Sequence, residues 1–156
     1  MGLSLAVALK ATATKYKMDG ADTLDLATIM SYETGGTYDE WKAGPRTQWG
    51  QHRGLIQWGE PQAKKYGVYK GMPAEAQVAA SVQFLMDHGW KPGMGRQAMY
   101  AAINAGDARK VDASDANNGG APGTVADKVR DQMTAHEQKA LALLGGDFSP
   151  APMNPY

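Results

Sequence analysis

Apolar residues recur at spacings of three and four in several separate stretches of this chain, and this pattern restricts its fold more than any other feature. Such spacing places apolar side chains on one face of an α-helix. The first stretch predicts an amphipathic helix that ends near Met18 and Gly20. Its apolar face consists of Leu5, Ala6, Leu9, Ala13 and Tyr16.

Further stretches with a helical pattern follow the irregular segment at residues 34–59. Prolines and capping residues mark where they start, and glycines mark where they end. No stretch alternates convincingly as a strand does, and we find no internal repeat, so the sequence predicts an all-α fold. These predicted helices cover residues 61–66, a longer stretch from Pro73 through Leu85, about 96–104, and one last helix from the cap Thr124 to Leu144.

Length and composition favour a single domain. The chain has 156 residues, of which 43% are hydrophobic, and this is enough to build one buried core without a metal or a disulfide. We assign residues 1–146 to this domain, including a polar loop at 111–123, and residues 147–156 to a proline-rich C-terminal tail. Cysteine is absent, which excludes thiolate metal sites and cysteine nucleophiles.

The charge balance argues against two classes of partner. The 16 basic and 16 acidic residues give a formal net charge of zero, so the chain as a whole lacks the long-range attraction that drives binding to nucleic acid or to an anionic membrane. No stretch reaches the roughly 18 apolar residues that a membrane span needs. The N-terminal apolar run is short and lacks a basic leader, so no signal peptide is predicted.

Glu33 is a carboxylate predicted to lie on an apolar helix face. A second helix is expected to open at Asp22 as its N-cap, and Glu33 continues the apolar stripe near its C-terminal end. Burial and the negative end of the helix dipole both raise the pKa of a carboxylate, which suits a general acid. The alternative is a structural glutamate that reaches solvent or pairs with Arg46 or Arg53. The stripe consists of Leu26, Ile29 and Met30.

The segment that follows Glu33, residues 34–59, is long and irregular, with room for a short hairpin. Long ordered loops commonly carry function. Aromatic and glutamine side chains gather in and around it, and flat apolar faces beside amides suit sugar rings and their hydroxyls. The alternative is that the aromatics pack the core. These residues are Tyr32, Tyr38, Trp41, Trp49 and Trp58, with Gln48, Gln51 and Gln57.

At these positions the sequence resembles the catalytic signature of soluble lytic transglycosylases and goose-type lysozymes. In that family a glutamate ends a helix, a Gly-Leu-Met-Gln stretch follows, and an Asn-Ala-Gly closes the pattern. The resemblance covers about residues 23–106 and implies a lysozyme-like single domain. The matching residues are Glu33-Thr34-Gly35, Gly54-Leu55-Ile56-Gln57, Ala63, Gly67-Val68 and Asn104-Ala105-Gly106.

The resemblance also implies a reaction. Glu33 would protonate the glycosidic oxygen between N-acetylmuramic acid and N-acetylglucosamine in peptidoglycan, and would then act as a base on the muramyl 6-hydroxyl to close a 1,6-anhydro ring. Amide side chains can both donate to and accept from the sugar's acetamido and hydroxyl groups, although a purely structural role for them is equally open. The implied substrate-binding residues are Gln57 and Asn104, with Trp58, Tyr32 and Gly54 beside them.

The chain departs from the family pattern at three places. Ile103 stands where the family has a tyrosine before Asn-Ala-Gly, and Ile56 stands in place of methionine. No serine precedes Gly54 in the position where the family often has one. Tyr100 or Thr47 can take over these roles.

A hydrolytic muramidase is the first alternative, and it normally needs a second carboxylate. That carboxylate stands about 6.5–9.5 Å from the acid in an inverting enzyme and about 5–5.5 Å in a retaining one. Asp39, Glu40 and Glu60 are the candidates, but their local pattern favours solvated loop charges. The sequence therefore favours a transglycosylase.

Two other function classes stay open. One is an endopeptidase that cleaves peptidoglycan cross-links on the same fold, and the other is a noncatalytic wall-binding or structural virion module. The three histidines, His52, His88 and His136, show no metal-ligand spacing, and no phosphate-binding glycine motif is found, so neither a metal nor a cofactor is expected.

The predicted lack of a signal peptide favours a bacteriophage protein. Such a protein is carried in the virion or released from the host cytoplasm, and it acts in the periplasm or cell wall. Its expected partners are the glycan strands of peptidoglycan and phage tail or virion proteins.

Overall fold

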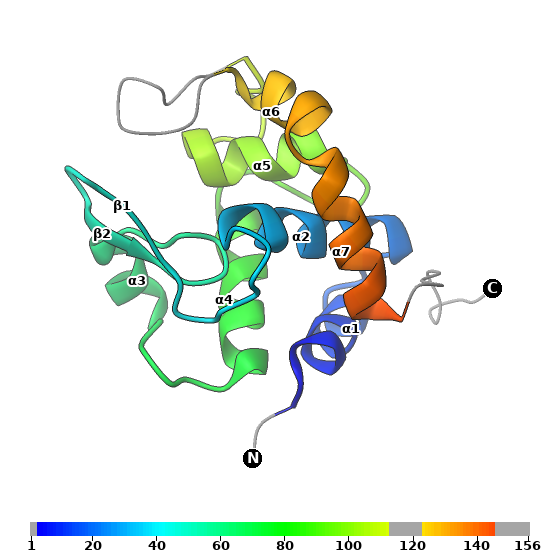
Figure 1. Cartoon of the computed structure of the whole chain (residues 1–156), viewed down its shortest axis with the longest axis horizontal. Coiled ribbons are helices and arrows are strands. Elements are labelled where there is room, and N and C mark those ends of the chain that lie inside the picture. The colour runs from blue at the N-terminus through cyan, green and yellow to red at the C-terminus, as the bar shows by residue number, and fades with distance from the viewer. Residues whose placement is uncertain (1–2, 113–122, 146–156) are drawn as a thin grey trace.

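The computed structural model describes residues 3–112 and 123–145, which form a mostly helical body with one small sheet (Figure 1). The predicted helix-rich class is confirmed, and a hairpin lies inside the 34–59 segment. The tail at 147–156 and most of the predicted loop at 111–123 lie outside the described residues. The described elements are α1 (Leu5–Lys15), α2 (Gly20–Glu33), β1 (Ala43–Thr47), β2 (Gly50–Arg53), α3 (Glu60–Tyr66), α4 (Ala74–Asp87), α5 (Arg96–Ala105), α6 (Val125–Asp131) and α7 (Thr134–Leu144).

Helix α2 begins earlier than predicted. Its N-cap is Asp19, whose carboxylate accepts a hydrogen bond from the backbone N–H of Asp22, 2.8 Å away. Asp22 in turn accepts from the N–H of Asp19, so the two close a capping box. The prediction of Asp22 as the N-cap was wrong by one turn, because Asp22 supports the helix start from its third position.

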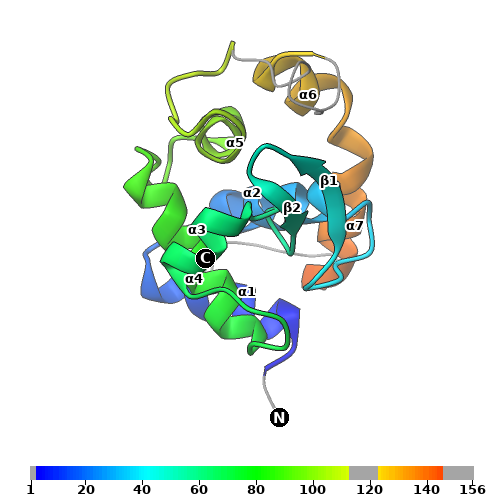
Figure 2. The same ribbon diagram turned by 90° about the vertical axis from the view of Figure 1, so that its left-hand side faces the viewer.

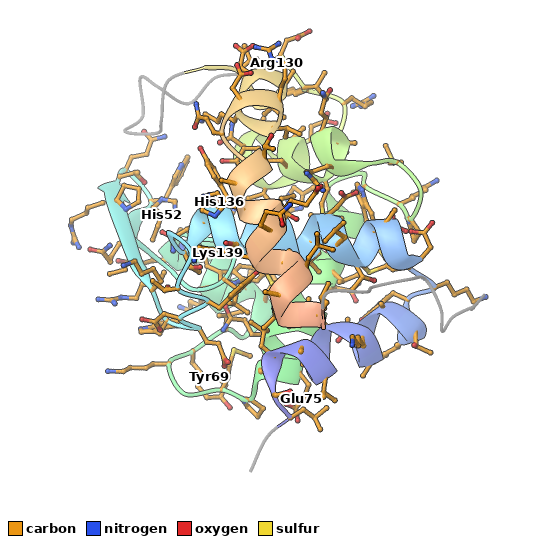
Figure 3. The ribbon with its side chains drawn as sticks, turned by 45° about the vertical axis from the view of Figure 1, so that its right-hand side comes forward. His52, Tyr69, Glu75, Arg130, His136 and Lys139 are labelled. Atoms are coloured by element: carbon orange, nitrogen blue, oxygen red, sulfur yellow. The ribbon has the colours of Figure 1, made fainter. Side chains whose placement is uncertain are left out.

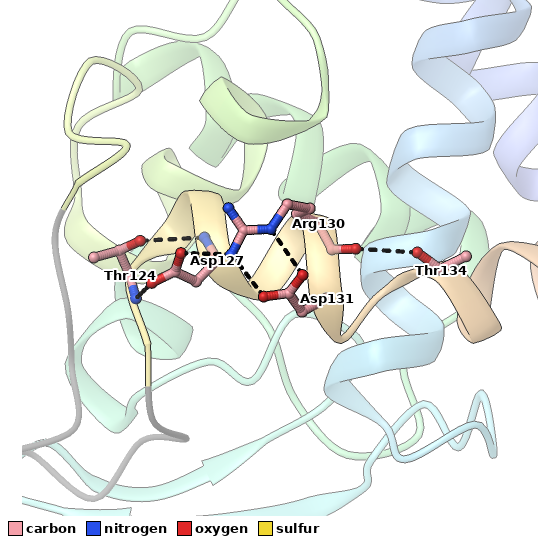
Figure 4. Close-up of polar contacts among 5 residues, drawn as sticks. All are labelled: Thr124, Asp127, Arg130, Asp131 and Thr134. Carbon is pink, nitrogen blue, oxygen red and sulfur yellow. Dashed lines mark hydrogen bonds and ion pairs between the residues drawn. The ribbon is translucent and has the colours of Figure 1, made fainter.

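The last predicted helix is two helices. Thr124 is the N-cap, as predicted, and forms a capping box with Asp127. Helix α6 then ends at Asp131, and the hydroxyl of Thr134 donates to the Arg130 carbonyl at 3.2 Å across the break (Figure 4). The break lets α6 pack on α5 while α7 packs on α2, which one straight helix could not do.

Helix α2 is the central element of the core. It packs against α7, α5 and α1, and Figures 1 and 2 show it in the middle of the molecule, between α5 and α1. Its predicted apolar stripe, Leu26, Ile29 and Met30, is at most 1% exposed. Helix α4 packs on α1 and closes the core. Of the helices described, none has the length and apolarity that a membrane crossing requires.

Helices α2 and α5 lie side by side and run in the same direction. Arg96, at the start of α5, pairs with Asp25 in the first half of α2, with 2.8 Å between Nε and Oδ1. One turn later, the ring of Tyr100 meets that of Tyr32 near the end of α2, with 5.8 Å between centroids. Arg96 also binds Glu137 of α7 at 2.7 Å. The C-terminal ends of α2 and α5 therefore lie on the same side of the molecule.

Candidate active site at the end of α2

Glu33 is the last residue of α2, and its side chain is half-buried. The predicted partial burial is therefore confirmed. The hydroxyl of Thr34 donates to the Met30 carbonyl at 2.8 Å, and the N–H of Gly36 donates to the Ser31 carbonyl at 2.7 Å. Gly36 has φ +83°, a left-handed conformation that favours glycine. This glycine turn ends the helix directly after the carboxylate.

Tyr32, a predicted substrate-binding residue, is half-buried beside Glu33 and has its own partners. Its hydroxyl donates to Gln132 Oε1 at 2.6 Å. Its ring meets the rings of Tyr100 and His136 edge to face, at centroid distances of 5.8 and 5.6 Å. Edge-to-face aromatic pairs contribute about 0.5–1.5 kcal/mol beyond burial. The structure therefore gives Tyr32 a bracing role for the end of α2.

Asn104 lies one helical turn beyond Tyr100 on α5, on the same face of that helix. Helices α2 and α5 run in the same direction, and Tyr100 contacts Tyr32. Asn104 therefore lies on the face of α5 that is turned toward α2, near the end of α2 that carries Glu33. The Asn104 side-chain nitrogen is buried, and within the described residues it has no hydrogen-bond partner. A buried donor without an acceptor costs about 1–3 kcal/mol.

Gln57 adopts a left-handed conformation, with φ +58°, that residues other than glycine rarely take. Its side-chain nitrogen donates to the carbonyls of Lys42 and Gly54, each at 3.0 Å. Its backbone carbonyl bonds His52 Nδ1 at 2.9 Å. Its side-chain oxygen is buried, has no partner in the described chain and lies against Gly44, where a Cβ would come within 1.6 Å of it. Gln57 therefore stabilises the conformation of residues 40–55, which contain β1 and β2 and are called the hairpin segment below.

Gly54 is buried and has φ +91°, and a Cβ at this position would lie 2.7 Å from Gln77 Oε1. Gln77 of α4 accepts a hydrogen bond from the Leu55 N–H at 2.9 Å and donates one to the Glu40 carbonyl at 3.0 Å. It therefore fastens both ends of the hairpin segment to α4. Sequence reasoning missed Gln77, although a glutamine within the apolar stripe of α4 is the same kind of signal that singled out Glu33.

The aromatic residues of the segment divide between core and surface. Trp58 is 2% exposed and packs against Tyr66 and Phe84, with centroids 5.6 Å apart in each pair. This burial leaves no indole face for a sugar ring, so the predicted substrate contact at Trp58 is replaced by a core role. Trp49, in the turn between β1 and β2, is 54% exposed. The guanidinium of Arg53 lies 6.0 Å from the Trp41 ring centroid.

The three candidate second carboxylates serve other local roles. Asp39 is exposed and accepts a hydrogen bond from the Trp41 N–H at 2.9 Å. Glu60 is exposed at the start of α3 and accepts from the Gln51 N–H at 2.8 Å. Glu40 is half-buried, and burial raises its pKa, as do the charges of Asp39 and Glu75. All three are therefore tied to the hairpin segment or to neighbouring acids.

The histidines take part in side-chain networks. Within the described residues, no three histidine, cysteine or acidic side chains form a group that could hold a metal. His52 bonds the Thr47 hydroxyl at 2.7 Å in addition to the Gln57 carbonyl. His136 of α7 bonds the Ser31 hydroxyl at 2.8 Å, a contact with α2 that the sequence did not reveal.

Comparisons of this chain with protein-family models, with curated proteins and with solved structures found no match. The resemblance to transglycosylases therefore depends on the motif residues themselves and on where the fold brings them.

Proposed function

We propose that this protein is a peptidoglycan lytic transglycosylase with Glu33 as its single acid and base. The observation that carries the proposal is the placement of Glu33. It ends the central helix of the core as a half-buried carboxylate, and the residue before it, Tyr32, donates a hydrogen bond to Gln132. The helix beside it runs in the same direction and carries Asn104, whose buried amide nitrogen has no partner in the described chain.

In the proposed reaction, the protonated Glu33 carboxyl donates its proton to the glycosidic oxygen while the bond from that oxygen to the muramyl C1 breaks. The resulting Glu33 carboxylate takes the proton of the muramyl 6-hydroxyl as the O6–C1 bond forms. Glu33 ends the cycle protonated, as it began. The first step requires the neutral form of the Glu33 carboxyl.

The local roles of the three candidate second carboxylates support ring closure over hydrolysis. Asp39 and Glu60 are exposed and accept backbone hydrogen bonds within their own segment. Glu40 is half-buried, and burial raises its pKa, as do the charges of Asp39 and Glu75, whereas a hydrolase normally needs a second carboxylate at a defined distance from the acid. A lysozyme-like fold, a bacteriophage origin and attachment to virion proteins rest on the motif resemblance and belong to the same proposal.

The test is digestion of purified peptidoglycan, with the products identified by mass spectrometry. The parent should release anhydro-muropeptides, and Glu33→Gln should release none while keeping the parent's circular dichroism and melting temperature. Glu75→Gln is the matched control, because Glu75 is also a half-buried glutamate on a helix and should remain active. Reducing ends from the parent would establish a hydrolase, cleaved cross-links a peptidase, and no products from folded parent protein a noncatalytic module.

A further inference from the structure

Three side chains on α7 and in the turn before it contact the segment that carries Glu33, and we call them the α7 clamp: Gln132, His136 and Lys139. Gln132 lies in the turn before α7, and His136 and Lys139 lie one turn apart on one face of it. In Figure 3, His136 and Lys139 lie on the same side of α7. Helix α7 packs closely along α2.

The clamp holds the two residues that directly precede Glu33. His136 Nδ1 lies 2.8 Å from the hydroxyl of Ser31, which is fully buried. The His136 ring also meets the Tyr32 ring edge to face at 5.6 Å, and Gln132 accepts the hydrogen bond of the Tyr32 hydroxyl at 2.6 Å. The α7 clamp therefore contacts α2 at two successive residues, Ser31 and Tyr32.

The clamp also meets the turn that directly follows Glu33. A Cβ on Gly36 would lie 2.8 Å from Cε of Lys139, so the aliphatic part of Lys139 lies across this glycine. The Gly36 N–H donates to the Ser31 carbonyl at 2.7 Å, which connects the turn to the residue that His136 holds. The contacts of the clamp thus bracket Glu33 in the sequence, at positions 31, 32 and 36.

We propose that the α7 clamp positions the Glu33 carboxylate for catalysis, with His136 as the residue that sets it through Ser31 and Tyr32. This inference rests on the proposed function for its kinetic consequence, but its structural part concerns Glu33 alone. Misplacement of a reacting group by about 1 Å can cost about a hundredfold in rate. A helix end is the part of a helix that moves most easily, so a catalytic group there needs support from outside the helix.

The ionisation of His136 agrees with this role. Burial lowers the pKa of His136, and the ammonium of Lys139 lowers it further. The ring is therefore neutral at neutral pH, and its Nδ1 can accept the proton of the Ser31 hydroxyl.

The experiment compares His136→Ala with a matched histidine, His88→Ala. His88 is also half-buried, and its ring bonds the Phe84 carbonyl through Nδ1 at 2.7 Å and stacks on the Phe84 ring. We expect His136→Ala to lower kcat about ten- to hundredfold with little change in KM, and His88→Ala to leave kcat within about twofold. His136→Asn, which can place an acceptor near the Nδ1 position, should restore much of kcat.

A second variant guards against misfolding of the first. Ser31→Ala removes the same hydrogen bond without introducing a larger group, and the double variant Ser31→Ala/His136→Ala should lose no more than His136→Ala alone, because both act through one contact. Equal kcat for His136→Ala and His88→Ala, or additive losses in the double variant, would overturn the inference.

A readout without substrate separates this inference from the proposed function. Carbon-13 NMR of the labelled Glu33 carboxyl reports its chemical shift and titration midpoint. His136→Ala should change both relative to the parent, and His88→Ala should change neither. If the parent digests no peptidoglycan but this contrast is seen, the proposed reaction fails while the positioning role stands. If the contrast is absent, the positioning role fails whatever the parent digests.

Discussion

Gln77 provides a quantitative test of how the hairpin segment is held against the core. Its side chain is 1% exposed, and it links the Leu55 N–H and the Glu40 carbonyl at 2.9 and 3.0 Å. Gln77→Met keeps most of the volume and removes both hydrogen bonds. Because Leu55 is fully buried, its N–H would lose its partner out of reach of water, at a cost of about 1–3 kcal/mol, and the second bond adds about 0.5–1.5 kcal/mol. The expected loss in the free energy of unfolding is about 1.5–4.5 kcal/mol.

Urea unfolding followed by circular dichroism measures this loss, with Gln83→Met as the control on the same helix. Gln83 is exposed and accepts a 3.3 Å hydrogen bond from the Tyr16 hydroxyl. For a urea slope of about 2 kcal/mol per molar, the midpoint of Gln77→Met should fall by about 0.8–2.2 M and that of Gln83→Met by less than about 0.3 M. Hydrogen exchange at the Leu55 amide should also become faster. Midpoints within about 0.2 M of each other would refute the reasoning.

Two further predictions concern Asp25 and Trp49. Burial raises the pKa of Asp25 to about 6, although Arg96 opposes the shift, so the folded chain binds a proton that the unfolded chain has released between about pH 4 and 6. The parent should therefore gain stability relative to Asp25→Asn, by at most about 3 kcal/mol, as the pH falls through 6 toward 4. It should lose this gain as the pH rises again. If the urea midpoints of parent and Asp25→Asn differ by the same amount at pH 7 and at pH 4, the prediction is contradicted. Trp49, in the hairpin turn, is 54% exposed, and Tyr69, outside the hairpin, is 59% exposed. If the hairpin turn contacts glycan, Trp49→Ala should raise KM about two- to tenfold at an unchanged melting temperature. The control Tyr69→Ala should leave KM unchanged.

The sequence predicted the helices and the partial burial of Glu33, because both follow from local periodicity. It misplaced the start of α2, since Asp19 with Asp22 and Asp22 with Asp25 have the same spacing and either pair can start a helix. It also joined α6 to α7. That break depends on which neighbours the two helices pack against, and the spacing of apolar residues within 124–144 does not contain this information.

The fate of the aromatic residues could not be predicted from the segment that contains them. Trp49 and Trp58 lie in the same irregular stretch, yet the first is exposed and the second is enclosed by Tyr66 of α3 and Phe84 of α4. The difference arises from helices that come later in the chain. The same holds for His136, whose bond with Ser31 joins residues more than a hundred positions apart.

The two amide residues of the motif resemblance, Gln57 and Asn104, have different surroundings in the fold. Both hydrogen bonds of the Gln57 side-chain nitrogen go to carbonyls of its own segment, and its oxygen is enclosed against Gly44. Its role is therefore to shape the segment. The Asn104 nitrogen is a buried donor without an acceptor in the described chain, and this cost is recovered when a ligand oxygen reaches it. A sugar acetamido or hydroxyl oxygen is such an acceptor, so under the proposed function Asn104, rather than Gln57, is the amide expected to contact substrate.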